Sequence, residues 1–145
     1  MQTIIITGGR TLQGTVCPES AKNSVLPLMA AALLCRGRVT LHSVPRLADV
    51  ETSIALLRAV GADVQRRGAD LLLCADTPLC GQIPARLSGA MRSSVFYLAP
   101  LLCRTGTVRL PLPGGCRLGP RPVDIHFAGL TALGAAVELE GDAAT

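Results

Sequence analysis

One thiol, one guanidinium and one carboxylate stand close together in the sequence, at Cys116, Arg121 and Asp124. The surrounding residues 111–124 include three glycines and four prolines, which cannot continue a helix or a central strand and therefore predict a rigid loop. Arg117 and Arg121 place positive charge beside the Cys116 thiol, a setting that lowers a cysteine pKa and makes the residue usable as a nucleophile or a proton donor. A tight connection around a buried cysteine explains the same residues equally well.

A second group of polar residues precedes the apolar block at residues 25–35. This block is long enough for a helix, and Pro27 fits if the helix begins near Asn23 or Ser24, because first-turn amides have no intrahelical partner to lose. Lys22 and Asn23 then lie at a helix N-terminus, where free N–H groups and the helix dipole favour an anion. Lys22 is the only lysine beside thirteen arginines, which indicates a specific use for its ammonium group. The alternative is that this lysine has been retained by chance and has no specific role.

The elements that must position these residues form an internal repeat of about 70 residues. Leu-Leu-Cys-Arg at 33–36 returns at 101–104, and the apolar residues of 50–62 return at 123–135. In each copy, apolar residues at i, i+4 and i+7 form one helical face, and a glycine stands where the residue after a helix belongs. Each unit is therefore predicted as helix, strand, connection, helix and strand, with a final strand at 71–74 in the first unit.

The repeat also aligns two cations. Residues 90–94 match residues 21–24 with one residue of slip, so Lys22 and Arg92 are predicted at equivalent helix N-termini. The second unit stops at Thr145, about where its last strand should begin. We therefore expect the chain to be a fragment or one part of a longer protein, with an unpaired sheet edge.

The start of the chain predicts a β-hairpin outside the repeat. Residues 2–8 are rich in β-branched side chains, Gly8-Gly9 is typical of a turn, and residues 14–17 can form the second strand.

Composition limits the classes of fold and partner. Of the 145 residues, 49% are hydrophobic and 17% charged, which predicts a folded domain with a substantial core. Only 2% are aromatic and the arginines are scattered, so nucleic acid is not expected as a partner; the net charge of +4 suits an anionic small molecule. The longest apolar run, residues 25–35, is too short to span a bilayer, so no membrane association is expected.

Cysteine usage indicates the compartment. Six cysteines are present, but they form no CxxC pair and neither histidine stands near two of them, so a metal site is weakly supported. The sequence shows no signal-peptide pattern at its start. Reduced cysteines and a cytoplasmic location are therefore expected.

These motifs resemble one enzyme family. Ala-Lys-Asn at 21–23, Met-Arg-Ser-Ser at 91–94, and Leu-Pro-Gly-Gly-Cys at 112–116 followed by Arg-Pro-Val-Asp at 121–124 and by His126 together resemble the UDP-N-acetylglucosamine enolpyruvyl transferases of bacterial cell-wall synthesis. The resemblance runs from about residue 8 to the end of the chain, with the motifs in order.

The resemblance implies a fold class and a domain division. The family has an inside-out α/β barrel (α+β) built of repeated βαβαββ units, three in each of two domains, and the first strands cross to the domain formed mainly by the C-terminal half. On this basis residues 1–19 belong to an absent C-terminal domain. Residues 20–145 then form an incomplete, truncated first domain, with units 20–88 and 89–145.

The resemblance also implies a reaction. The family transfers the enolpyruvyl group of phosphoenolpyruvate to the 3-hydroxyl of UDP-N-acetylglucosamine by addition and elimination, releases phosphate, and needs no metal or organic cofactor. Cys116 corresponds to the general acid and target of fosfomycin, and Lys22 to the residue that binds phosphoenolpyruvate. The remaining implied substrate contacts are Asn23, Arg92, Arg121, Pro122, Val123, Asp124 and Ile125. For Asp124, a carboxylate that complements the helix dipole is an equal alternative.

Other functions stay open. The essential aspartate base of the family lies in the C-terminal half, so the chain alone is expected to be inactive. One alternative is the related enolpyruvylshikimate-phosphate synthase, although Cys116 and the Lys22-Asn23 pair argue against it. A second alternative is a non-catalytic truncated product that at most binds a UDP-sugar weakly.

Overall fold

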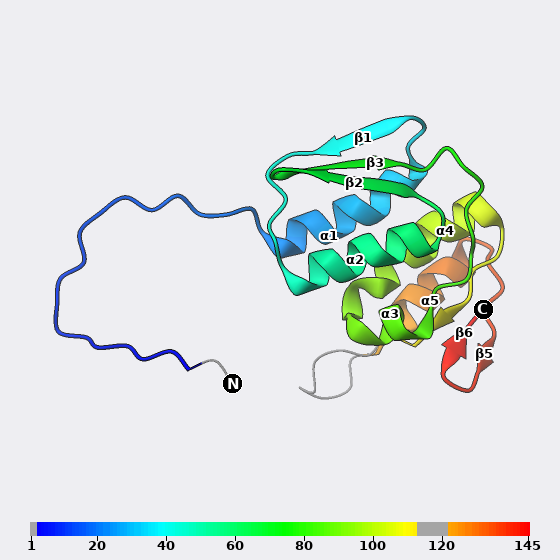
Figure 1. Cartoon of the computed structure of the whole chain (residues 1–145). Coiled ribbons are helices and arrows are strands. Elements are labelled where there is room, and N and C mark those ends of the chain that lie inside the picture. The colour runs from blue at the N-terminus through cyan, green and yellow to red at the C-terminus, as the bar shows by residue number, and fades with distance from the viewer. Residues whose placement is uncertain (1–2, 113–121) are drawn as a thin grey trace.

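The computed structural model describes residues 3–112 and 122–145 of the chain, which fold into two successive units (Figure 1). The first unit contains α1 (Lys22–Ala31), the 3-10 helix η1 (Ala32–Leu34), β1 (Arg38–Leu41), α2 (Ala48–Ala59), β2 (Asp63–Arg67) and β3 (Asp70–Cys74). The second contains α3 (Ala85–Ala90), the 3-10 helix η2 (Arg92–Tyr97), α4 (Leu98–Thr105), β4 (Leu110–Pro111), α5 (Asp124–Ala132), β5 (Leu139–Glu140) and β6 (Ala143–Ala144).

The two units share one sheet topology, which confirms the predicted repeat. Each has a three-stranded antiparallel sheet with the last strand in the middle, in the order β1-β3-β2 and then β4-β6-β5. In the first sheet Leu73 lies opposite both Val39 and Val64, and in the second Ala144 lies opposite both Leu110 and Leu139. The strand β6 therefore begins where the repeat predicts it.

The second helix of each unit ends in the same way. Gly61 after α2 has φ +103° and Gly134 after α5 has φ +97°, the left-handed region that glycine enters without strain from a Cβ atom. The residue after each glycine donates its N–H to a carbonyl of the preceding helix, Leu57 in the first unit and Leu130 in the second, both at 3.0 Å. The predicted glycine stops are thus confirmed.

Helices form the inside of this assembly. The helices of the two units contact one another, α1 with η2 and α2 with α3, while β2 packs on α2 and β4 on α3. Figure 1 shows the first sheet lying over α1 and α2. The core between these layers is aliphatic, as the low aromatic content requires, and its fully buried members include Met29, Val50, Leu57, Leu71 and Leu101.

Polar contacts also join the units. The hydroxyls of Ser53 in α2 and Tyr97 in η2, both fully buried, hydrogen-bond to each other. The guanidinium of Arg104 donates to the carbonyl oxygens of Leu33 and Ala75 in the first unit. A single β-bridge pairs Gln82 with Arg109.

The predicted N-terminal hairpin is wrong for this chain. Residues 3–20 contain neither helix nor strand and run away from the folded units as an extended arm (Figure 1). Ile4, Ile5 and Ile6 are 85–87% exposed. An extended segment becomes a stable strand only when it pairs with a neighbour, and within the described residues this arm pairs with none.

Candidate active site

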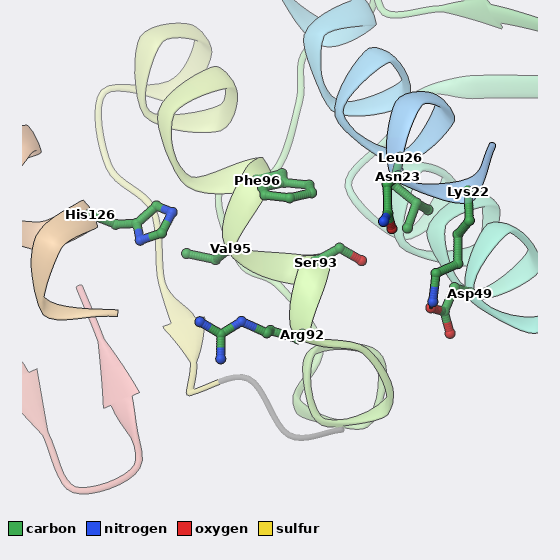
Figure 2. Close-up of a pocket in the computed structure, with 9 residues that line it drawn as sticks. All are labelled: Lys22, Asn23, Leu26, Asp49, Arg92, Ser93, Val95, Phe96 and His126. Atoms are coloured by element: carbon green, nitrogen blue, oxygen red, sulfur yellow. The ribbon is translucent and has the colours of Figure 1, made fainter. Parts of the chain in front are cut away.

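A cavity of about 400 Å³ opens where the beginnings of α1, η2 and α5 approach one another. Figure 2 shows its lining side chains, which come from both units. They are Lys22, Asn23, Leu26, Asp49, Arg92, Ser93, Val95, Phe96 and His126.

Lys22 is the first residue of α1. Ala21 before it has extended backbone, φ −76° and ψ 130°, and the first helical bond is the one from Ser24 N–H to the Ala21 carbonyl at 3.1 Å. The Lys22 and Asn23 amides thus precede the hydrogen-bonded part of the helix. The predicted position of this pair at a helix N-terminus is thus confirmed. Both residues line the cavity.

Asp49 fixes the position of the Lys22 side chain. The Lys22 Nζ lies 2.7 Å from the Asp49 Oδ2, and Asp49 stands in the first turn of α2, where the helix dipole favours a carboxylate. The two side chains are 46% and 35% exposed, so the pair contributes at most about 1 kcal/mol to stability. Its main effect is to hold the ammonium group at the mouth of the cavity.

Arg92 occupies the matching place in the second unit. It begins η2 after the extended residue Met91, φ −146° and ψ 139°. The predicted equivalence with Lys22 is confirmed, except that the second helix starts as a 3-10 helix and continues as α4. In Figure 2 the Arg92 guanidinium points away from Lys22, toward the side of the cavity where His126 lies.

Sequence reasoning missed three lining residues with polar side chains. Asp49 is one of two acidic residues in the first turn of α2. This pattern is common, and it does not indicate that Asp49 contacts Lys22, which stands 27 positions earlier in the chain. His126 and Ser93 lie within the quoted motifs, but neither was expected to be a site residue. The repeat could have indicated Ser93, since it follows Arg92 as Asn23 follows Lys22.

The remaining expected site residues lie elsewhere. Cys116 and Arg121 fall outside the described residues. Pro122 and Asp124 are exposed at the start of α5, Val123 is 9% exposed, and Ile125 is 81% exposed. None of this last group of four lines the cavity, which α5 reaches through His126 alone.

The side chains that commonly hold metal ions are dispersed over the described part of the chain. Within residues 3–112 and 122–145, no three His, Cys, Asp or Glu side chains gather closely enough to hold a metal ion. The cysteines in that part of the chain are free thiols, namely Cys17, Cys35, Cys74, Cys80 and Cys103.

Among the helices of residues 3–112 and 122–145, none has the length and apolar character needed to cross a membrane.

The cavity combines charges suited to an anionic ligand. Lys22 and Arg92 supply two basic side chains from opposite sides, and Asn23 adds an amide that can both donate and accept. Charge-assisted hydrogen bonds from such groups bind phosphate and carboxylate oxygens more strongly than neutral ones. A ligand with two anionic groups and a polar, uncharged part fits this distribution.

Comparison with known proteins agrees with this chemistry. The sequence profile of the family described as EPSP synthase (3-phosphoshikimate 1-carboxyvinyltransferase) matches residues 6–145. The UDP-N-acetylglucosamine 1-carboxyvinyltransferase of Rhodospirillum centenum is 43% identical over 151 residues, covering 97% of this chain and 35% of that protein. The enzyme of the same name from Acidiphilium cryptum is 45% identical, covering 97% and 34%.

A solved structure shows the fold. The crystal structure of the enolpyruvyl transferase NikO from Streptomyces tendae matches with a TM-score of 0.77 and 24% identity, over 94% of this chain and 30% of that one. The expected fold class is thereby confirmed. The chain spans about a third of the length of the curated relatives that it matches.

Proposed function

Because this chain belongs to the EPSP synthase family of 1-carboxyvinyltransferases, we propose that it contributes to transfer of the enolpyruvyl group from phosphoenolpyruvate to the 3-hydroxyl of UDP-N-acetylglucosamine. This is the first committed step of peptidoglycan synthesis, which cell-wall growth and cell division require. The observation that carries the proposal is that Lys22, Asn23 and Arg92, which come from two units, line the same cavity.

The described residues act on the substrates by charge and orientation. Lys22 binds the phosphate and carboxylate of phosphoenolpyruvate, helped by the first-turn amides of α1. Arg92 contacts the anionic groups from the other side of the cavity, and Asn23 orients the sugar. Holding both reactants in one geometry lowers the barrier to addition of the hydroxyl.

The other expected roles complete the proposal. Cys116 delivers a proton to the methylene carbon of phosphoenolpyruvate as the sugar hydroxyl adds to the neighbouring carbon, and fosfomycin alkylates the same thiol. Arg121 contacts the anionic groups together with Arg92, and residues 122–125 line the UDP-sugar site. The aspartate base that removes a proton during elimination comes from the part of the enzyme that this chain does not match, so the chain alone does not turn over.

The location and domain assignments belong to the same proposal. We place the enzyme in the cytoplasm, where both substrates are made. Residues 1–19 complete a sheet of the second domain, and the exposed isoleucines of the arm are the side chains that this sheet would bury. Residues 20–145 contribute two units to the first domain.

One observation favours a second candidate activity. The matching family profile is described by 3-phosphoshikimate rather than by a sugar nucleotide, so shikimate 3-phosphate is the alternative acceptor. The names of the curated relatives at 43–45% identity favour the UDP-sugar. A non-catalytic chain that at most binds a UDP-sugar is the remaining alternative.

Co-expression tests the proposal. The chain is produced together with the segment of the Rhodospirillum centenum relative that it does not match, and phosphate release from phosphoenolpyruvate is measured with each acceptor. Release with UDP-N-acetylglucosamine supports the proposal, and release with shikimate 3-phosphate alone supports the second activity. No release with either acceptor from a folded complex supports the non-catalytic reading. The matched control is Lys22→Gln, which should abolish release without unfolding the exposed start of α1.

A thiol-labelling experiment tests the Cys116 assignment. The chain is incubated with fosfomycin, with and without UDP-N-acetylglucosamine, and the adduct is located by intact mass and peptide mapping. A single adduct on Cys116 is expected, and Cys103→Ser should leave it unchanged. An adduct distributed over several cysteines contradicts a specific role for Cys116.

A further inference from the structure

The strongest unassigned feature of the cavity is the Ser93 hydroxyl. Its oxygen is shielded from solvent and has no hydrogen-bond partner among residues 3–112 and 122–145. Ser93 nevertheless lines the cavity with Lys22, Asn23 and Arg92. Leaving a hydroxyl buried without a partner is unfavourable, so such a group at a cavity wall calls for a functional explanation.

The next residue in the chain shows that packing alone does not explain this serine. Ser94 is fully buried, and its hydroxyl donates to the Ser88 carbonyl at 3.4 Å, while the Ser88 hydroxyl donates to the Pro111 carbonyl. Two neighbouring serines are thus satisfied within the protein. Of the three serines, only Ser93 lines the cavity.

The internal repeat gives Ser93 a counterpart of known placement. Lys22 and Arg92 begin equivalent helices, so Ser93 is the second-unit equivalent of Asn23. Each unit therefore supplies a cation followed by a neutral hydrogen-bonding side chain. In Figure 2 the Ser93 side chain points toward the side of the cavity where Lys22 and Asn23 of α1 lie.

We propose that the Ser93 hydroxyl binds the sugar substrate together with Asn23, as a hydrogen-bonding and specificity-determining contact contributed by the second unit. The inference depends on the proposed function, because it takes the ligand of the cavity to be the sugar nucleotide. A hydroxyl both donates and accepts, which suits the hydroxyl and amide groups of an acetylated sugar.

The hydroxyl reaches the ligand by a small local movement. Serine has three staggered χ1 positions separated by low barriers, so rotation about one bond brings the oxygen into the cavity. The neighbouring side chains of Phe96 and Asn23 can move to make room for it, since Phe96 is 40% exposed and Asn23 is exposed. Binding thereby gives the oxygen the partner that the unliganded chain does not supply.

Two measurements on the full chain test the inference. First, the urea midpoint of Ser93→Ala is compared with those of the wild type and of Ser94→Ala. Because Ser93 makes no internal hydrogen bond in the described structure, its midpoint should equal or exceed the wild-type value, whereas Ser94→Ala should lower it. A clear fall for Ser93→Ala assigns the hydroxyl a structural bond and overturns the inference.

Second, binding of UDP-N-acetylglucosamine is followed by saturation-transfer NMR. Ser93→Ala should weaken it about tenfold, the effect of one lost hydrogen bond, Ser93→Thr should restore most of it, and the exposed control Ser24→Ala should change nothing. Unchanged binding in Ser93→Ala overturns the inference while leaving the proposed function intact. A wild-type chain that does not bind the sugar nucleotide also overturns it, and the co-expression assay then decides the proposed function independently.

Discussion

Lys22 Nζ and Asp49 Oδ2 lie 2.7 Å apart at the mouth of a cavity that both residues line. An anion that binds Lys22 must therefore share the ammonium group with a carboxylate of the protein. Asp49 limits where the ammonium can go, and at the same time it repels a negatively charged ligand. The ion pair thus lowers the affinity of Lys22 for an anionic ligand, and it holds the Lys22 ammonium group in a defined position.

Replacing Asp49 should separate these two effects. In Asp49→Asn the repulsion between carboxylate and ligand disappears, which at about 4 Å in water amounts to roughly 1 kcal/mol. Phosphoenolpyruvate should bind a few-fold more tightly, as measured by ³¹P NMR titration at low salt, and Lys22→Gln should remove the binding. The control Asp63→Asn lies on β2, away from the cavity. Weaker binding in Asp49→Asn shows that orientation of Lys22 outweighs repulsion.

The buried Ser53–Tyr97 hydroxyl pair should behave as a unit. Tyr97→Phe leaves the Ser53 hydroxyl without this partner and should lower the free energy of unfolding by about 1–3 kcal/mol. The double variant Ser53→Ala/Tyr97→Phe should be less destabilised than the sum of the two single variants. Urea denaturation of the four proteins measures the coupling, and strict additivity contradicts it.

Tyr97 also reports on folding by its own ionisation. Burial raises the pKa of its phenol, although the hydrogen bond with Ser53 acts in the opposite direction. Because Tyr97 is the only tyrosine, absorbance near 295 nm should show phenolate formation only where circular dichroism shows alkaline unfolding. Ionisation near pH 10 in a folded chain contradicts this placement.

Two glycines form a matched pair for testing backbone packing. A Cβ atom on Gly81 would lie 2.0 Å from the Thr107 carbonyl oxygen, whereas one on Gly89 in α3 meets nothing within 4 Å. Gly81→Ala should therefore destabilise the chain by about 1–3 kcal/mol, because the bridge beside it must move. Gly89→Ala should stabilise it by about 0.5–1 kcal/mol. Thermal unfolding of both variants checks the difference in sign.

Acid should weaken the first unit through Asp70. Its carboxylate accepts hydrogen bonds from His42 Nδ1 at 2.9 Å and from the Ser43 N–H at 3.2 Å, and these lower the pKa of Asp70. A lowered pKa in the folded state gives stability that is present above the ordinary value, near 3.8, and is lost as the pH falls through the folded value.

Asp70→Asn should accordingly reduce the loss of unfolding free energy between about pH 5 and about pH 2.5, a range that brackets that ordinary value. Some loss should remain, because the pKa of Asp76 is also lowered, mainly by the Gly37 N–H. Urea midpoints across this range measure the effect. An acid-induced loss as steep in Asp70→Asn as in the wild type contradicts the assignment.

The sequence predicted the features whose causes are local. The start of α1, the glycine stops after α2 and α5, and the repeat follow from periodicity and from residues with special backbone preferences. Strand order does not, because it depends on which segments meet in space. The short helix α3 escaped prediction since its six residues include a glycine and give too few turns for a periodic signal.

The candidate site was predictable only in part, for the same reason. Lys22 and Asn23 could be placed because they begin a helix whose start the sequence indicates, and Arg92 because the repeat aligns it with that start. Asp49 joins them only through the packing of α1 against α2, which no local pattern encodes. The arm of residues 3–20 shows the converse case, in which a clear strand pattern forms no strand because pairing needs a neighbour.

The sheet order also constrains how the protein can be made. In the first unit the last strand, β3, lies between β1 and β2, so a nascent chain that has not yet delivered residue 70 to the ribosome exit carries two strands with nothing to join them. Because the last strand also lies in the middle of the second sheet, synthesis in the N-to-C direction leaves each sheet without any strand pairing until its final strand has been made.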